Sequence, residues 1–201
     1  MKMKKFFVLA AVSAFSVAAS AQTNDPKHMI NFDVGSVLQG SLNFDSSKAR
    51  GQSSDNDTQL QLDLNYAYQL PMLKNVQAGI RFDYTKDTAS GRGDYEDYGA
   101  DIGAYWNFQR SGQELDLRNS FYASLFVGYG WANTYTAGTN DDEVFRTTAA
   151  FGKRIDLSDW GMGSLSYTPE VAFQSINSKT GGALEYTQNV QLRFLQFSVL
   201  F

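Results

Sequence analysis

Apolar and polar residues alternate with a period of two through most of the chain after residue 21. The clearest case is residues 58–70, where leucines and tyrosines at even positions alternate with mainly polar residues at odd positions. Successive side chains of a β-strand point to opposite faces, so this pattern predicts strands with one apolar and one polar face. Similar segments begin near residues 30, 76, 98, 121, 145, 164 and 186. The pattern therefore predicts eight strands, each close to the ~9–11 residues that a tilted strand needs to cross a bilayer.

The connections between these segments also alternate in length. Residues 45–57 and 86–97 are long and polar, whereas residues 71–75 and 156–161 are short; the segment 109–119 fits neither class well. Long loops at one end and short turns at the other are typical of an antiparallel up-and-down transmembrane β-barrel. The asymmetry predicts that both chain termini lie at the end with the short turns.

Alternation alone also fits a soluble barrel or a β-sandwich whose apolar face points inward. Two features favour a barrel in lipid. The polar face is rich in glutamine, asparagine, serine, threonine, aspartate and glycine and poor in lysine, which suits the crowded interior of an eight-stranded barrel. Aromatic residues of the apolar face gather near strand ends, for example Trp106 and Phe121 at one end and Tyr129 and Trp131 at the other. Such girdles match the two membrane interfaces.

The first 21 residues have the three parts of a secretory signal peptide. Lys2, Lys4 and Lys5 precede an apolar run, and small residues follow at Ala19 and Ala21, where a signal peptidase would cleave. The apolar run is too short for a spanning helix, which needs ~20 residues. We therefore expect residues 1–21 to be a cleaved signal peptide and residues 22–201 to be the barrel domain.

The chain ends on an aromatic residue with alternating apolar positions before it, namely Leu195, Phe197, Val199 and Phe201. In this ending the sequence resembles bacterial outer-membrane proteins, and as a whole it is similar to the small eight-stranded barrels of the OmpA, OmpX and OmpW type. The resemblance implies the outer membrane of a Gram-negative bacterium and both termini in the periplasm. It also implies recognition of the C-terminal strand by the barrel-assembly machinery, contact with outer-membrane lipid and lipopolysaccharide, and a monomeric state.

The last predicted strand contains a change of phase. Val190, Leu192 and Phe194 have the opposite parity from the terminal apolar residues. A β-bulge near Phe194 and Leu195 would let both sets face lipid. Without a bulge, either Arg193 faces lipid or the terminal aromatic residue does not.

Several charged residues fall on the inward parity, where an unpaired charge is costly. Counting outward from the turns predicts two ionic clusters, one of Arg81 with Asp63 and Asp101 and one of Arg146 with Glu170. The clusters would either plug and rigidify the barrel or act as a gate on a narrow ion path.

Composition excludes several function classes. The chain has no cysteine and one histidine, His28, and its net charge is −4, so thiolate metal sites and an affinity for nucleic acid are not expected. No phosphate-binding loop, metal-ligand spacing or nucleophile elbow is present, which predicts neither enzyme activity nor a cofactor.

We expect a structural or surface-interaction barrel with a plugged lumen. The alternative is a small channel or conduit for small or hydrophobic solutes, favoured weakly by the inward parity of Tyr105, Tyr122 and Phe126.

Overall fold

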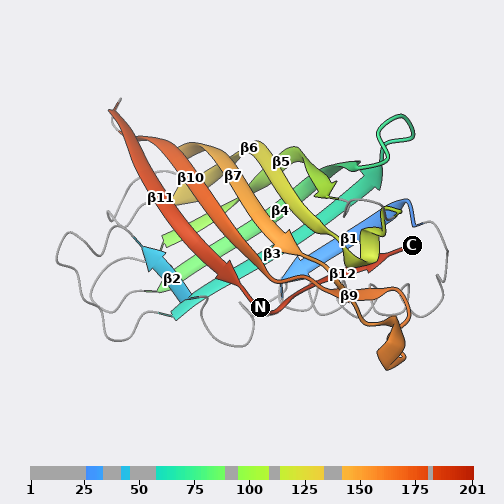
Figure 1. Cartoon of the computed structure of the whole chain (residues 1–201). Helices are drawn as coiled ribbons and strands as arrows, with labels where there is room; N and C mark the ends of the chain where they lie inside the picture. The colour runs from blue at the N-terminus through green and yellow to red at the C-terminus, as the bar shows by residue number, and fades with distance from the viewer. Residues whose placement is uncertain are drawn as a thin grey trace.

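The structure is a computed structural model, and it describes residues 26–33, 42–45, 58–88, 95–108, 114–133, 142–180 and 183–201. These residues form twelve strands in one antiparallel sheet and two short 3-10 helices (Figure 1). The first six strands are β1 (His28–Asp33), β2 (Leu42–Asp45), β3 (Thr58–Gln69), β4 (Val76–Thr88), β5 (Tyr95–Phe108) and β6 (Phe121–Asn133). The others are β7 (Asp142–Lys153), β8 (Ile155–Asp156), β9 (Leu165–Tyr167), β10 (Glu170–Thr180), β11 (Ala183–Arg193) and β12 (Gln196–Leu200). The 3-10 helices are η2 (Leu117–Asn119) and η3 (Ser158–Trp160).

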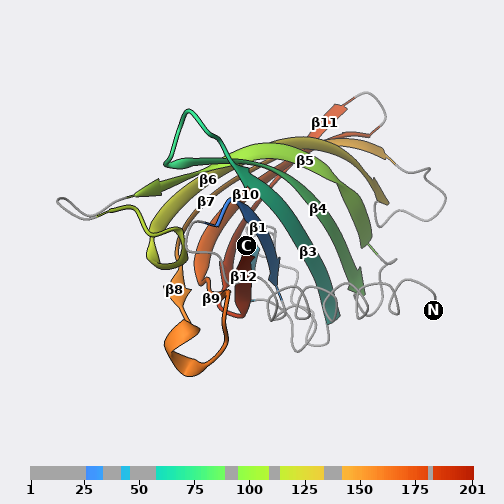
Figure 2. The same ribbon diagram turned by 90° about the vertical axis from the view of Figure 1, so that its right-hand side faces the viewer.

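The strands follow the order β2-β11-β10-β7-β6-β5-β4-β3-β1-β12-β9-β8. Consecutive strands from β3 to β7 pair as a simple meander, and Figure 2 shows this part of the sheet curving into a barrel wall. β1 pairs with β3 on one side and with β12 on the other, which joins the beginning of the chain to its end. The backbone amides of Lys27 and His28 also donate to the carbonyl of Phe201. No helix among the described residues is long and apolar enough to cross a membrane.

Three predicted strands are divided into two segments each by local irregularities at their short-turn ends. β7 and β8 are separated by Arg154, and β9 and β10 by Thr168 and Pro169. The amide of Lys153 donates to the carbonyl of Pro169, but proline has no N–H to return the bond, so the ladder is interrupted there. The sheet therefore has more segments than the eight strands that the alternation predicts.

The third division, between β11 and β12, is the predicted bulge. Arg193 is opposite Glu170, and Phe197 is opposite Tyr167. The chain advances four residues on the terminal strand against three on its partner, so one residue is inserted at Phe194 and Leu195. Both of these side chains are exposed, whereas Arg193 and Gln196 on either side are buried. The bulge thus reverses the phase of the strand and keeps polar residues inward on both sides of it.

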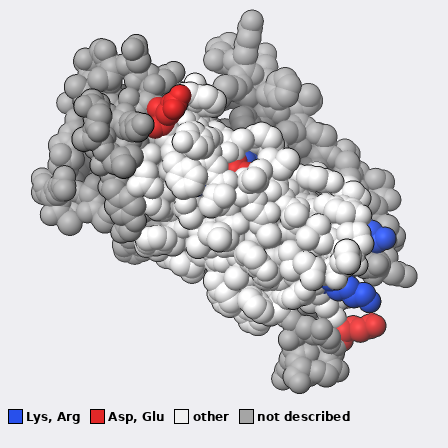
Figure 3. Space-filling model, turned by 90° about the horizontal axis from the view of Figure 1, so that it is seen from above, with Lys and Arg blue, Asp and Glu red and all other residues white. Residues whose placement is uncertain are grey.

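Burial in this sheet is the reverse of that in a soluble protein. Inward residues such as Asn31, Gln77 and Thr148 are polar and almost fully buried, whereas the outward Ile102 and Phe151 are 66% and 55% exposed. Figure 3 shows a broad and mostly uncharged surface on the face seen from above, with most of the visible charged groups toward its ends. A polar interior and an apolar exterior are the arrangement of a barrel that faces lipid.

Candidate functional site: the charged interior

The interior holds a set of charged side chains carried by the inward positions of six strands. We call it the lumen network: Asp63 of β3, Arg81 and Asp83 of β4, Asp97 and Asp101 of β5, Arg146 of β7, Glu170 of β10 and Arg193 of β11. All are buried. They meet because a period of two places every second residue of each strand on the inner face, and the register of neighbouring strands brings the charged positions to similar heights.

Arg146 lies at the centre of one end of this network, where it contacts three of the carboxylates. Its guanidinium lies 2.6 Å from Asp83, 2.8 Å from Asp97 and 3.1 Å from Asp101. Two glycines make room for it: a Cβ atom at Gly99 would overlap Nη2 of Arg146, and one at Gly128 would overlap Oδ1 of Asp101. These two inward glycines therefore leave room for the ionic groups.

Arg81 lies between the aspartates with which the sequence pairs it. Its Nε atom is 3.2 Å from Asp63 and 3.8 Å from Asp101. The pairs follow from the register, in which Arg81 is directly opposite Asp101 on β5 and opposite Asn65, two residues from Asp63, on β3. The structure thus brings together all three members of the first predicted cluster.

The second predicted cluster, Arg146 with Glu170, is wrong. Glu170 is opposite Gly152 of β7, six residues from Arg146, and its carboxylate lies 2.9 Å from Arg193. The prediction counts outward from the middle of the short connection 156–161, at residue 158, but the ladder between β8 and β9, with Ile155 opposite Tyr167, centres the turn at residue 161. A shift of three residues in the centre changes the pairing by six. Arg193 also lies 2.8 Å from Asp63, so it joins Glu170 to the rest of the network.

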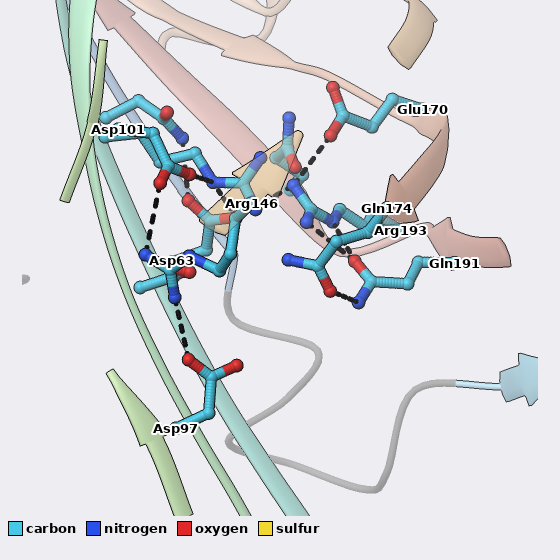
Figure 4. A network of polar contacts seen from close by, with 12 residues as sticks. Asp63, Asp97, Asp101, Arg146, Glu170, Gln174, Gln191 and Arg193 are labelled. Carbon is cyan, nitrogen blue, oxygen red and sulfur yellow. Dashed lines mark hydrogen bonds and ion pairs between the residues drawn. The ribbon is translucent and has the colours of Figure 1, made fainter. Parts of the chain in front are cut away.

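The network is continuous along the interior, as Figure 4 shows for its central part. It runs from Asp97 through Arg146, Asp101, Arg81, Asp63 and Arg193 to Glu170. Five carboxylates face three guanidinium groups in it, and Gln191 accepts further hydrogen bonds from Arg193. Because arginine does not release its proton in proteins, the alternation of acids with arginines cannot pass protons from group to group. The chemistry of the network is that of a rigid ionic brace.

An apolar cluster, which we call the apolar plug, lies in the interior beyond Glu170, at the end with the short turns. It consists of Tyr105, Tyr122 and Phe126 with Met29, Ala67, Leu117 and Leu200. The hydroxyl of Tyr122 donates to Glu170 at 2.7 Å, which links the plug to the lumen network. Leu117 comes from η2, so the described part of the connection between β5 and β6, residues 114–120, folds into the end of the barrel.

Arg154 fastens this connection. Its guanidinium donates to Asn107, to the hydroxyl of Ser120 and to the carbonyl of Leu117, and it lies 4.6 Å from the centre of the Tyr122 ring. Its charge is therefore satisfied by amide, hydroxyl and carbonyl oxygens and by an aromatic face. Arg154 has the inward parity, but the pattern gives it no partner, because Leu117 and Ser120 belong to an irregular segment and Asn107 is 47 residues away in sequence. Asp97 was also missed, since it was assigned to the loop 86–97.

The other predicted site residues lie at the chain ends. Phe201 stacks on His28 with ring centres 5.4 Å apart, and Nδ1 of His28 lies 2.8 Å from the hydroxyl of Tyr66. Of the remaining terminal apolar residues, Leu195 is exposed, Phe197 is half-buried and Val199 is buried. Ala19 and Ala21 lie outside the described residues. Within the part of the chain that is described, no group of three or more histidine or acidic residues could hold a metal ion.

Comparisons with known proteins give a consistent result. A family model described as outer membrane protein beta-barrel domain matches residues 7–197. The fold is similar to the outer membrane protein Ail of Yersinia pestis in a phospholipid nanodisc, with 12% identity and a TM-score of 0.45 over 88% of this chain and 99% of that one. It is also similar to the outer membrane protein AlkL in lipid bilayers, with 14% identity and a TM-score of 0.43 over 90% and 92% of the two chains. No curated protein matches the chain.

Proposed function

The chain belongs to the outer membrane β-barrel domain family, and we propose that it is a closed barrel with a structural or surface-interaction role rather than an open pore. The family places it in the outer membrane of a Gram-negative bacterium. One observation carries the proposal: the lumen network and the apolar plug occupy successive levels of the interior and are joined by the hydrogen bond from Tyr122 to Glu170.

The energetics of the interior support this proposal. Removing one partner of a buried ion pair typically costs about 3–5 kcal/mol, because the other charge stays buried and unpaired. Opening a path for solutes would require several such pairs to separate, and beyond them the packed rings of Tyr105 and Phe126, whose centres are 5.2 Å apart, would also have to part. A barrel of this kind presents its loops and its wall to partners and keeps its interior closed.

We propose that the twelve segments act as eight spanning strands. The segments on either side of each short interruption then form one strand, and β1 and β2 together form the first. In this arrangement, residues 1–21 are a cleaved signal peptide and both termini lie in the periplasm. The barrel is a monomer that the assembly machinery inserts, with lipid and lipopolysaccharide around it.

Conductance across planar bilayers tests the closed interior. We expect the refolded protein to give no steady single-channel steps in potassium chloride, because conduction would require the buried ion pairs and the packed rings to separate. Regular, reproducible steps would contradict the proposal and favour the alternative, a small channel or conduit for small or hydrophobic solutes.

We also propose that the protein has no enzymatic activity. The histidine of the chain, His28, is engaged with Tyr66 and Phe201 on the outward face, far from the inward acids that a base would need as an orienting partner. Mass spectrometry of lipid A from cells with and without the protein should give the same profile. A new or missing acyl chain would identify a lipid-modifying enzyme instead.

A further inference from the structure

Two connections at the end of the barrel where Lys27 meets Phe201 have large apolar side chains at their tips. The hairpin between β8 and β9 exposes Trp160 to 76% and also exposes Met162, and the turn between β3 and β4 exposes Met72 to 95% and also exposes Leu73. They share this end because His28 pairs with Tyr68 near the turn, while the amide of Leu200 donates to Ser164 in the hairpin. Exposing apolar side chains of this size to water is unfavourable, so we expect them to contact something other than water.

Both connections are fixed by their own hydrogen bonds. In the hairpin, Asp156 accepts from the backbone amide and the hydroxyl of Ser158 at 2.9 Å, and Gly161 adopts a φ of 78° that closes the 3-10 turn. In the turn, the side-chain amide of Gln69 donates to the carbonyl of Leu73 at 3.0 Å. The apolar tips are therefore presented by ordered backbone.

The hairpin also bends away from the barrel axis. Figures 1 and 2 both show the β8–β9 hairpin turned outward from the barrel wall. Leu157, at the base of the hairpin, is buried against Leu165 and Val199 on the outward side, which holds this bend. A tip that projects sideways at the end of a membrane barrel runs along the membrane surface rather than into the periplasm.

The apolar belt of the barrel leads to the hairpin. Phe151 and Ile155 are exposed along β7 and β8, and between them Lys153 lies over the ring of Phe121 at 4.8 Å and donates to the carbonyl of Asn119. A lysine that covers an aromatic ring and turns its amine toward polar groups is typical of the headgroup level. Lys74 is exposed beside Leu73 at the other tip. Lys74 therefore places a cation beside the tip of the turn, and Lys153 places one on the belt that leads to the hairpin, whose own tip carries Asp159 next to Trp160.

We propose that Trp160 and Met162 of the hairpin, with Met72 and Leu73 of the turn, insert into the headgroup–acyl boundary of the periplasmic phospholipid leaflet and fix the depth of the barrel in the membrane. The two tips are well placed for this role because β1 and β12 separate them on one side of the sheet and β5 to β7 on the other. Contacts on two sides of the barrel resist both sliding and tilting.

The depth of single tryptophans tests this proposal. The chain has three tryptophans, Trp106, Trp131 and Trp160, so the double variant W106F/W131F reports Trp160 alone. The variant is refolded into phosphatidylcholine vesicles that contain lipids brominated either near the headgroup end or near the methyl end of the acyl chain. We expect blue-shifted emission and about twofold stronger quenching by the shallow bromines than by the deep ones, because indole prefers the interface.

The variant W131F/W160F, which reports the belt residue Trp106, is the matched control. Quenching of Trp106 by brominated lipid shows that the barrel is inserted, whether or not Trp160 touches lipid. If Trp106 is quenched while Trp160 keeps the emission of a water-exposed indole and responds only to aqueous acrylamide, the lipid docking is refuted and the hairpin faces the periplasm. That result would leave the closed-barrel function untouched.

Discussion

Replacing Arg146 with methionine should destabilise the folded barrel by about 3–5 kcal/mol, because the substitution leaves buried carboxylates without their cation. Asp83, Asp97 and Asp101 all lie within 3.1 Å of its guanidinium, and Arg146 itself is fully buried. Methionine has a similar length and fills much of the same space, so the loss reports charge rather than packing. The free energy of unfolding in urea, measured in vesicles, checks the size of the effect.

The same substitution should also open the interior to cations. With Arg146 removed, five carboxylates of the lumen network face only Arg81 and Arg193. Such an excess of negative charge attracts cations and water. We expect the R146M protein to show small cation-selective conductance steps in planar bilayers under conditions in which the native protein shows none.

Two further variants give this experiment its controls. Lys153 lies on the same strand and contacts Asn119 at the surface, so K153M should cost less than about 1 kcal/mol. Adding D83N and D97N to R146M removes two of the unpaired charges and should recover part of the lost stability and suppress the conductance. If R146M is as stable as K153M, the network is not a brace.

The sequence predicted which side chains of the strands point inward and which point outward, but it did not predict every pair of charged residues that meet across strands. Asp63 and Arg81 were grouped correctly because β3 and β4 are joined by the compact turn at residues 70–75, which Pro71, Lys74 and Asn75 mark well. Arg146 was misassigned because the β8–β9 hairpin contains a 3-10 helix and two glycines of positive φ, which move the centre of the turn by three residues. An error in the predicted centre of a turn therefore shifts the predicted pairing of the two strands by twice as many residues.

The sequence showed only part of the apolar plug: Tyr105, Tyr122 and Phe126 have the inward parity, but nothing in the pattern adds Leu117 to them. Leu117 enters the barrel from an irregular connection, and its position depends on Arg154, which is 37 residues away in sequence, together with Asn107 and Ser120. Period-two patterns describe only residues that stay in a ladder. The bulge at Phe194 and Leu195 was predictable for the same reason: it interrupts a strong pattern, and the interruption is visible as a change of parity.

Deleting Leu195 should leave the barrel folded, although it shortens a membrane strand. Phe194 and Leu195 together face Pro169, since Arg193 is opposite Glu170 and the amide of Thr168 donates to the carbonyl of Gln196. Removing one of the two residues restores one-to-one pairing, with Phe194 opposite Pro169. Every other side chain of the strand keeps its face, and the terminal alternation of Phe197, Val199 and Phe201 is unchanged.

Deleting Gln191 instead should abolish folding, although the chain loses the same number of residues. A slip of one position turns a strand over, so residues 183–190 of β11 would exchange their inward and outward faces against β10. Val190 would occupy the inward position of Gln191, where Arg193 now finds a hydrogen-bond acceptor at 2.6 Å. If residues 183–190 instead keep their pairing with β10 and the residues after the deletion shift by one position, Arg193 would face lipid.

The comparison of the two deletions separates register from recognition of the C-terminus, because both variants keep residues 196–201 intact. Refolding into vesicles followed by electrophoresis without heating distinguishes the compact folded barrel from the unfolded chain. We expect the native mobility shift for the protein that lacks Leu195 and its loss for the protein that lacks Gln191. Equal behaviour of the two variants would mean that the bulge does not set the phase of the terminal strand. A difference in the expected direction would show that the inserted residue is dispensable once polar residues face inward on both sides of it.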